Sequence, residues 1–141
     1  MLEEPFVAAV SKTHPLARRK WVDWADLNDH AYITLAQGSG NRFLMDQALA
    51  PSGARPRHFC EVQHVPALVS MVEAGLGVGV VPRLAMPHDG HGTLVSVPLR
   101  NPAVTRTIGL IHPRGKALNP VASLFYDLLA AKVEARVQKK A

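Results

Sequence analysis

The chain has 141 residues, of which 48% are hydrophobic and 19% are charged. These values are ordinary for a globular protein with one domain or two small lobes. No apolar run approaches the roughly 20 residues that cross a bilayer, and the N-terminus has no signal-peptide pattern, so we expect a cytoplasmic protein. The net charge of +5 comes with no basic stripe, recognition helix or zinc-finger pattern, so direct nucleic-acid binding by this chain is not predicted. Cys60 is the single cysteine, which excludes an intrachain disulfide and favours a buried free thiol.

The first half of the chain predicts strands that alternate with short helices. Asp23 is a suitable N-cap for one short helical turn, and a proline after His14 favours a chain reversal there. In chain order, we expect a strand at 5–11, a turn at 14–17, a helical turn at 24–27, a strand at 31–35, a helix at 41–50 and a strand at 57–63.

The segment 64–82 predicts a helix, a glycine turn and a buried strand. Its apolar residues follow the spacing of one helical face: Val65, Leu68, Val69 and Val72. Pro66 suits the first helical turn, and Gly75 suits a left-handed C-cap because it has no Cβ. The valine-rich run at 78–81 is apolar on both faces, which is typical of a strand inside a sheet covered by helices.

The second half adds two strands, at 93–99 and 105–112, and a C-terminal helix at about 119–139. The helix carries one apolar stripe: Val121, Leu124, Phe125, Leu128, Leu129 and Val133. Strands that alternate with helices predict an α/β fold with a mostly parallel (mixed) sheet flanked by helices.

Two corners of this sheet are candidates for a ligand site, because open α/β sheets bind ligands beyond the carboxyl ends of their strands. The first corner is a loop of small residues and hydrogen-bond donors: Gln37, Gly38, Ser39, Gly40 and Asn41. The second is His64 and Val65, at a helix start without the usual Ser, Thr, Asp or Asn cap, whose free N–H groups favour anions. If the two corners converge, they form a site for a small carboxylate. In the alternative, Ser39 caps its own helix and water solvates the other.

No catalytic, metal or cofactor site is predicted. His88, Asp89 and His91 lie in a glycine loop without a further fixed ligand, which favours a solvated loop. The glycines at 75–79 follow a helix and precede a strand, the reverse of a dinucleotide fingerprint. Ser39 and Ser70 lack a nucleophile elbow. We therefore expect a protein that is not an enzyme.

Three motifs together resemble the effector-binding domain of LysR-type transcriptional regulators. They are Glu-Pro-Phe-Val at 4–7 with His-Pro-Leu-Ala at 14–17, Trp-Ala-Asp-Leu at 24–27, and Val-Glu-Ala-Gly-Leu-Gly-Val-Gly-Val-Val-Pro at 72–82. The resemblance extends from about residue 3 to residue 129. It implies the fold of type-2 periplasmic solute-binding proteins, in which two α/β subdomains are joined by two crossing strands and enclose the effector.

The resemblance also implies a fragment that lacks the helix-turn-helix domain and most of the first subdomain. In this view, about 12–105 form the second regulatory subdomain, 5–11 and 106–113 are the hinge-crossing strands, and 118–139 form the C-terminal helix. The implied effector contacts are the loop 37–41 and the helix start at His64 and Val65.

The expected function is to sense a small organic, anionic effector and to transmit its binding through homo-oligomer contacts, with DNA bound only by the absent helix-turn-helix domain. The alternative is a stand-alone solute-binding or dimerisation module without a transcriptional role.

Overall fold

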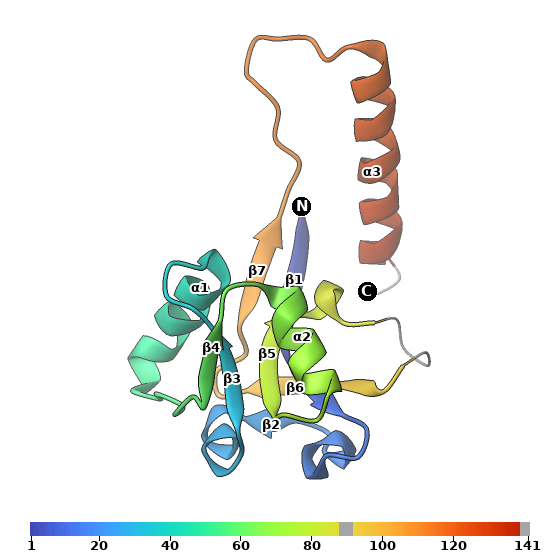
Figure 1. The fold of residues 1–141 in the computed structure, drawn as a ribbon. Helices are drawn as coiled ribbons and strands as arrows, with labels where there is room; N and C mark the ends of the chain where they lie inside the picture. The colour runs from blue at the N-terminus through green and yellow to red at the C-terminus, as the bar shows by residue number, and fades with distance from the viewer. Residues whose placement is uncertain (88–91, 139–141) are drawn as a thin grey trace. The chain divides into compact units, whose positions relative to one another are not determined.

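The structure, a computed structural model, describes residues 1–87 and 92–138 and divides into two units (Figure 1). One unit contains Met1–Glu3 and Thr107–Ala141, and the other contains Glu4–Arg106. The strands are β1 (Leu2–Ser11), β2 (Val22–Asp23), β3 (Tyr32–Leu35), β4 (Cys60–Val62), β5 (Val78–Pro82), β6 (Leu94–Arg100) and β7 (Thr105–Ile108). The α-helices are α1 (Gly40–Leu49), α2 (Val65–Glu73) and α3 (Pro120–Gln138), and the short 3₁₀ helices are η1 (Pro15–Arg18), η2 (Trp24–Asp29), η3 (Ala50–Ser52) and η4 (Arg83–Ala85).

The described strands form one seven-stranded sheet in the order β2-β6-β1-β5-β3-β4, with β7 paired to β1. The pairs β3–β4, β3–β5 and β2–β6 are parallel, whereas β1 runs antiparallel to both β5 and β6. The predicted α/β fold with a mixed sheet and flanking helices is therefore confirmed. Its antiparallel pairs arise because β1 runs between β5 and β6 in the direction opposite to both.

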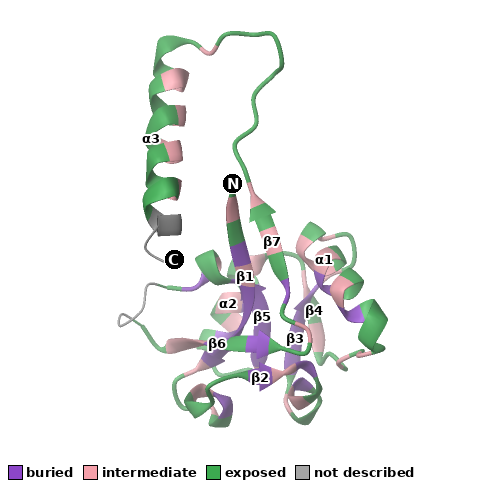
Figure 2. Ribbon diagram, turned by 180° about the vertical axis from the view of Figure 1, so that it is seen from behind, coloured by how far each residue is buried: buried purple, intermediate pink, exposed green. Residues whose placement is uncertain are grey.

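The core of the larger unit lies on both faces of this sheet. Alternate residues of β1 separate into two clusters, with Phe6, Ala8 and Val10 in one and Val7 and Ala9 in the other. The first cluster includes side chains of η1, η2 and α1, and the second includes those of α2. Figure 2 shows this burial concentrated in β1, β3 and β5. The middle of the sheet is therefore covered on both sides, as the apolar strands require.

Two predicted strands are shorter than the sequence pattern indicated. The strand at 57–63 is reduced to β4, because the Arg57 N–H donates to Asn28 Oδ1 (2.8 Å) instead of to a neighbouring strand. The strand at 105–112 ends at Ile108. Cys60, a free thiol as expected, is only half-buried because β4 is the last strand of the sheet order.

The helix–turn–strand segment in the middle of the chain forms as predicted. Helix α2 begins at Val65, and Gly75 adopts the left-handed conformation with φ of +78°. The Leu76 N–H donates to the Met71 carbonyl at 3.1 Å, which closes the helix end in the pattern that a glycine at this position permits.

Helix α3, in the smaller unit, begins after Asn119, whose Oδ1 accepts from the Ala122 N–H at 2.8 Å. Its apolar stripe is largely exposed: Val121, Leu124, Phe125 and Leu128 show 61–78% of their surface. Figure 2 shows the same exposure along the helix. Among the described residues, no helix is long and apolar enough to span a membrane.

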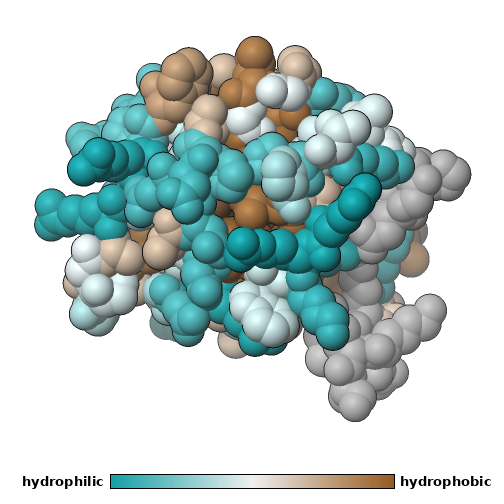
Figure 3. All heavy atoms as spheres, turned by 90° about the horizontal axis from the view of Figure 1, so that it is seen from below, coloured by the Kyte–Doolittle hydropathy of each residue, from teal (hydrophilic) through white to brown (hydrophobic). Residues whose placement is uncertain are grey.

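The surface of the chain, seen from below, carries mostly hydrophilic residues with hydrophobic ones between them (Figure 3). Several arginines are paired with carboxylates: Arg19 with Asp26 (3.3 Å), Arg42 with Asp46 (2.9 Å) and Arg106 with Glu4 (2.7 Å). The charges of these three arginines are therefore balanced by neighbouring carboxylates.

His14 makes the stability of the η1 region depend on pH. Its Nδ1 accepts from the Leu16 N–H at 3.2 Å, and its ring contacts that of His30 with centroids 4.7 Å apart. Burial, aided by the charge of His30, lowers the pKa of His14 below its ordinary value of 6.5. Since the folded state favours neutral His14, its contribution is present above about pH 6.5 and is lost as the pH falls through the lowered pKa.

We therefore expect the urea midpoint of the chain to fall between pH 7 and pH 5 by more than that of a His14→Asn variant, which keeps a side-chain acceptor but does not titrate. Equal pH dependence in the two proteins would show that His14 does not contribute.

Candidate functional site

The structure brings the two predicted corners to the same edge of the sheet. Strands β3 and β4 are parallel neighbours, with Leu35 opposite Val62. Just beyond them, the Ala36 N–H donates to the Val62 carbonyl at 2.8 Å. The loop at 37–41 and the helix start at 64–65 follow directly from these strand ends. Their adjacency is thus a consequence of the parallel register.

The first corner is a tight turn that leads into α1. Gly38 has φ of +93°, a conformation that favours glycine, and the Ser39 N–H donates to the Ala36 carbonyl at 3.2 Å. Ser39 occupies the N-cap position, but its side chain makes no capping hydrogen bond. The alternative in which the Ser39 hydroxyl caps its own helix is therefore not observed. Gln37, Gly38 and Gly40 are exposed, and Ser39 and Asn41 are half-buried.

The second corner is the start of α2. His64 is the N-cap residue, is exposed, and makes no side-chain capping bond. Its carbonyl accepts from the Leu68 N–H at 3.2 Å, the first bond of the helix. Val65 is half-buried and Pro66 lies in the first turn, where its lack of an N–H breaks no helical bond. As predicted, no side chain at the N-cap covers this helix end.

Arg106 and Glu4, which sequence reasoning did not select, also lie beside the first corner. Arg106 on β7 donates through Nη1 to Asn41 Oδ1 (2.9 Å) and through Nε to Glu4 Oε2 (2.7 Å). Glu4 on β1 is only 2% exposed, and its other oxygen accepts from the Leu84 N–H at 2.7 Å. Arg106 and Glu4 are 102 positions apart, so no local pattern joins them. Asn41, the last residue of the loop at 37–41, is thus linked through Arg106 on β7 to Glu4 on β1.

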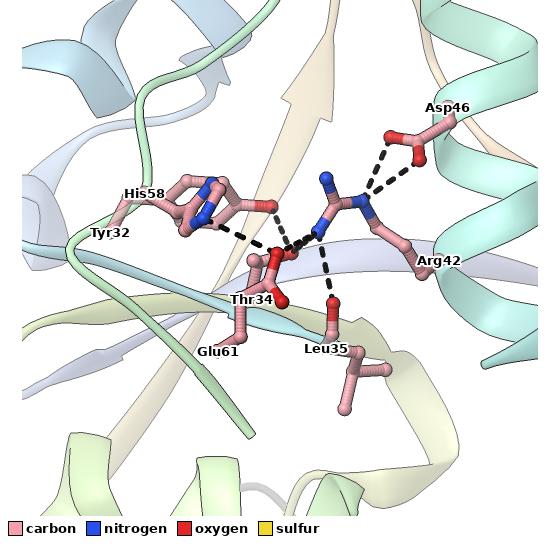
Figure 4. Close-up of polar contacts among 7 residues, drawn as sticks. All are labelled: Tyr32, Thr34, Leu35, Arg42, Asp46, His58 and Glu61. Atoms are coloured by element: carbon pink, nitrogen blue, oxygen red, sulfur yellow. Dashed lines mark hydrogen bonds and ion pairs between the residues drawn. The ribbon is translucent and has the colours of Figure 1, made fainter. Parts of the chain in front are cut away.

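Arg42, in the first turn of α1, links that helix to β3 and β4. Its Nε donates to both Asp46 oxygens at 2.9 Å, and its Nη1 donates to the Leu35 carbonyl (3.0 Å) and to Glu61 Oε1 (3.2 Å). Figure 4 shows the guanidinium between α1 and the ends of β3 and β4. Partial burial acts to lower the pKa of Arg42, but the hydrogen bond and charge of Asp46 and the hydrogen bond to Glu61 outweigh it and raise that pKa. Arg42 therefore remains charged and holds the first turn of α1 against the sheet.

A metal site finds no support in the described part of the chain. No group of three or more His, Cys, Asp or Glu side chains lies close enough together there to hold an ion. His88, Asp89 and His91 fall outside the described residues.

Several known proteins are similar to this chain in sequence or in fold. The chain is 39% identical over 129 residues to the uncharacterized HTH-type transcriptional regulator YbhD of Escherichia coli, covering 92% of this chain and 41% of YbhD. It is 29% identical over 129 residues to the transcriptional dual regulator GltC of Bacillus subtilis, covering 92% of this chain and 43% of GltC. The chain thus spans about two fifths of the length of these curated relatives.

The fold matches the CcmR regulatory domain of Synechocystis PCC6803 in complex with 2-PG, with a TM-score of 0.70, 24% identity, and coverage of 94% of this chain and 64% of that one. Residues 1–134 match the family model of the LysR substrate binding domain. Because the match includes both candidate corners and nearly the whole sheet, we conclude that the chain belongs to the LysR substrate-binding domain family.

Proposed function

We propose that this chain is the second regulatory subdomain of a LysR-type transcriptional regulator, together with its hinge strands and C-terminal helix. The family is one of regulator domains rather than enzymes, which agrees with the prediction from the sequence. In this proposal, the first subdomain and the helix-turn-helix domain belong to the remainder of a longer cytoplasmic protein that works as a homo-oligomer. The exposed stripe of α3 supports contact with a further apolar surface, for which the first subdomain is the natural candidate.

We further propose that the effector is a small organic anion that contacts the loop at 37–41 and the helix start at His64 and Val65. The observation that carries this proposal is the guanidinium of Arg106 beside Asn41 at the sheet edge where two helices begin. Among the described residues, its Nη2 has no acceptor, since Nε and Nη1 make the contacts to Glu4 and Asn41. Helix N-termini and an arginine donor both favour negative charge.

The ligands of similar domains support the same chemical class. A solved structure of the effector binding domain of QuiR contains shikimate, a carboxylate, and matches this fold with a TM-score of 0.64 at 23% identity, covering 89% of this chain and 59% of that one. We use shikimate as a probe for this reason, not as the assigned effector.

Titration of the isotope-labelled chain with shikimate is expected to shift the backbone amide signals of Ser39, Gly40, His64 and Val65 in NMR spectra. The neutral methyl ester of shikimate is expected to bind at least about fivefold more weakly, because it lacks the charge that the helix starts and Arg106 favour. Arg106→Gln is expected to weaken binding about tenfold, whereas Arg114→Gln, the same charge change in an exposed segment, leaves it unchanged. Absence of saturable shifts at these four amides across a panel of small carboxylates, with the protein shown to be folded, would contradict the site.

The alternative of a stand-alone binding or dimerisation module makes a different prediction about the gene. A helix-turn-helix coding segment directly upstream in the same reading frame supports the regulator, and a complete gene without one supports the module.

A further inference from the structure

A second pocket adjoins the candidate effector edge and lies between α1 and the segment at 53–58 in the larger unit. Its volume is about 470 Å³, which is in the range of small-molecule sites. Its apolar lining residues include Leu49, Ala50 and Ala54. Its polar lining residues include Arg42, Asp46, Arg55 and His58. Gln37 of the effector loop also lines this pocket, whereas the other residues of the effector edge do not.

Two polar residues of the lining, Arg42 and Arg55, have hydrogen-bond donors without an acceptor among the described residues. Arg42 is held rigidly by Asp46, Leu35 and Glu61 through Nε and Nη1, which leaves Nη2 without an acceptor among the described residues. Arg55 is exposed and makes no ion pair in the described part of the chain. Asp46, the acidic group of the lining, has both oxygens engaged by Arg42 Nε at 2.9 Å. The pocket therefore presents one neutralised arginine–carboxylate pair and one uncompensated arginine.

The arrangement selects for one kind of ligand. A carboxylate in the pocket would be attracted by Arg55 and Arg42, which both line it, and the fixed position of Arg42 lowers the cost of ordering that donor. An aliphatic or aromatic body would lie against Leu49, Ala50 and Ala54. A fully polar anion such as inorganic phosphate would leave these apolar side chains uncovered.

We propose that this pocket is a second ligand site, which shares only Gln37 with the effector edge and binds a small carboxylate with an apolar body. Arg42 directly follows Asn41 of the effector loop and holds the first turn of α1 against β3. A ligand on Arg42 would therefore act on the same loop that contributes to the effector edge.

Benzoate is the probe for this site, and benzamide is its neutral counterpart of nearly equal shape. In NMR spectra of the labelled chain, benzoate is expected to give saturable shifts of the amides of Gly53, Ala54, Arg55 and His58, with a dissociation constant of about 1 mM or lower. Arg55→Gln is expected to weaken this binding about fivefold. The matched control is Arg57→Gln, which removes the same charge from an exposed residue that does not line the pocket, and which is expected to bind benzoate like the original chain.

The outcomes separate this site from the proposed effector edge. Shifts confined to Ser39, Gly40, His64 and Val65 would overturn the second site while leaving the effector edge intact. Equal binding of benzamide, or equal weakening by Arg55→Gln and Arg57→Gln, would also overturn it, because the pocket would then not recognise the carboxylate through Arg55. Saturable shifts at 53–58 that persist when shikimate saturates the effector edge would support two independent sites.

Discussion

Replacement of Gly77 by alanine is expected to destabilise the folded chain by about 3 kcal/mol. A Cβ at this position would lie 2.0 Å from the carbonyl oxygen of Ala31, far inside any allowed contact. That oxygen cannot move freely, because it accepts the Val78 N–H at 2.9 Å and leads directly into β3. Relief of the clash would require β5 to move away from β3 at the centre of the sheet. The measurement is the free energy of unfolding in urea.

The matched control is Gly40→Ala at the start of α1. An added Cβ there meets nothing within 4 Å, so we expect a change of less than about 0.5 kcal/mol. Similar stability of the Gly77→Ala and Gly40→Ala variants would refute the close approach of β5 to Ala31. Gly79→Ala is expected to lie between them, because its Cβ would meet the side chain of Leu68 at 2.2 Å, which can rotate away in part.

Replacement of Glu4 by alanine is expected to cost about 3 kcal/mol of stability, because it removes the buried carboxylate of the ion pair with Arg106. The carboxylate is 2% exposed and accepts from Arg106 Nε and from the Leu84 N–H, each at 2.7 Å. Its loss leaves the Arg106 charge partly buried without its partner, and it leaves the Leu84 N–H without an acceptor. Glu4→Gln is expected to cost less, since the amide oxygen still accepts from the Leu84 N–H.

Glu3→Ala is the control for Glu4→Ala, because it removes the same group from the neighbouring residue. Glu3 is exposed and accepts a hydrogen bond from the Thr107 hydroxyl, so its loss is expected to cost less than about 1 kcal/mol. If urea unfolding gave the same loss for both variants, the buried pair would not be the reason for the effect of Glu4. The Glu4→Ala variant is also expected to release Arg106 from its fixed position beside Asn41 and so to weaken binding of shikimate.

The elements that the sequence predicted correctly are those whose signals are local. The spacing of Val65, Leu68 and Val72 and the place of Gly75 define α2 and its end without reference to the rest of the chain. The predicted strand at 57–63 was too long because apolar and polar alternation does not show whether a neighbour is available. The Phe59 N–H still donates to the Tyr32 carbonyl of β3 at 2.6 Å, but the Arg57 N–H bonds to a side chain of the distant Asn28.

The sequence alone predicts the family, the α/β class and both corners of the candidate edge, because each signal lies within short segments of the chain. The position of Arg106 and Glu4 beside Asn41, and the pocket that Arg42 and Arg55 line, follow from the tertiary structure. Strand order and register set these contacts, and they bring together residues up to 102 positions apart. A local sequence pattern indicates which face of a helix or strand a residue occupies. The packing of the whole sheet decides which charged groups come into contact.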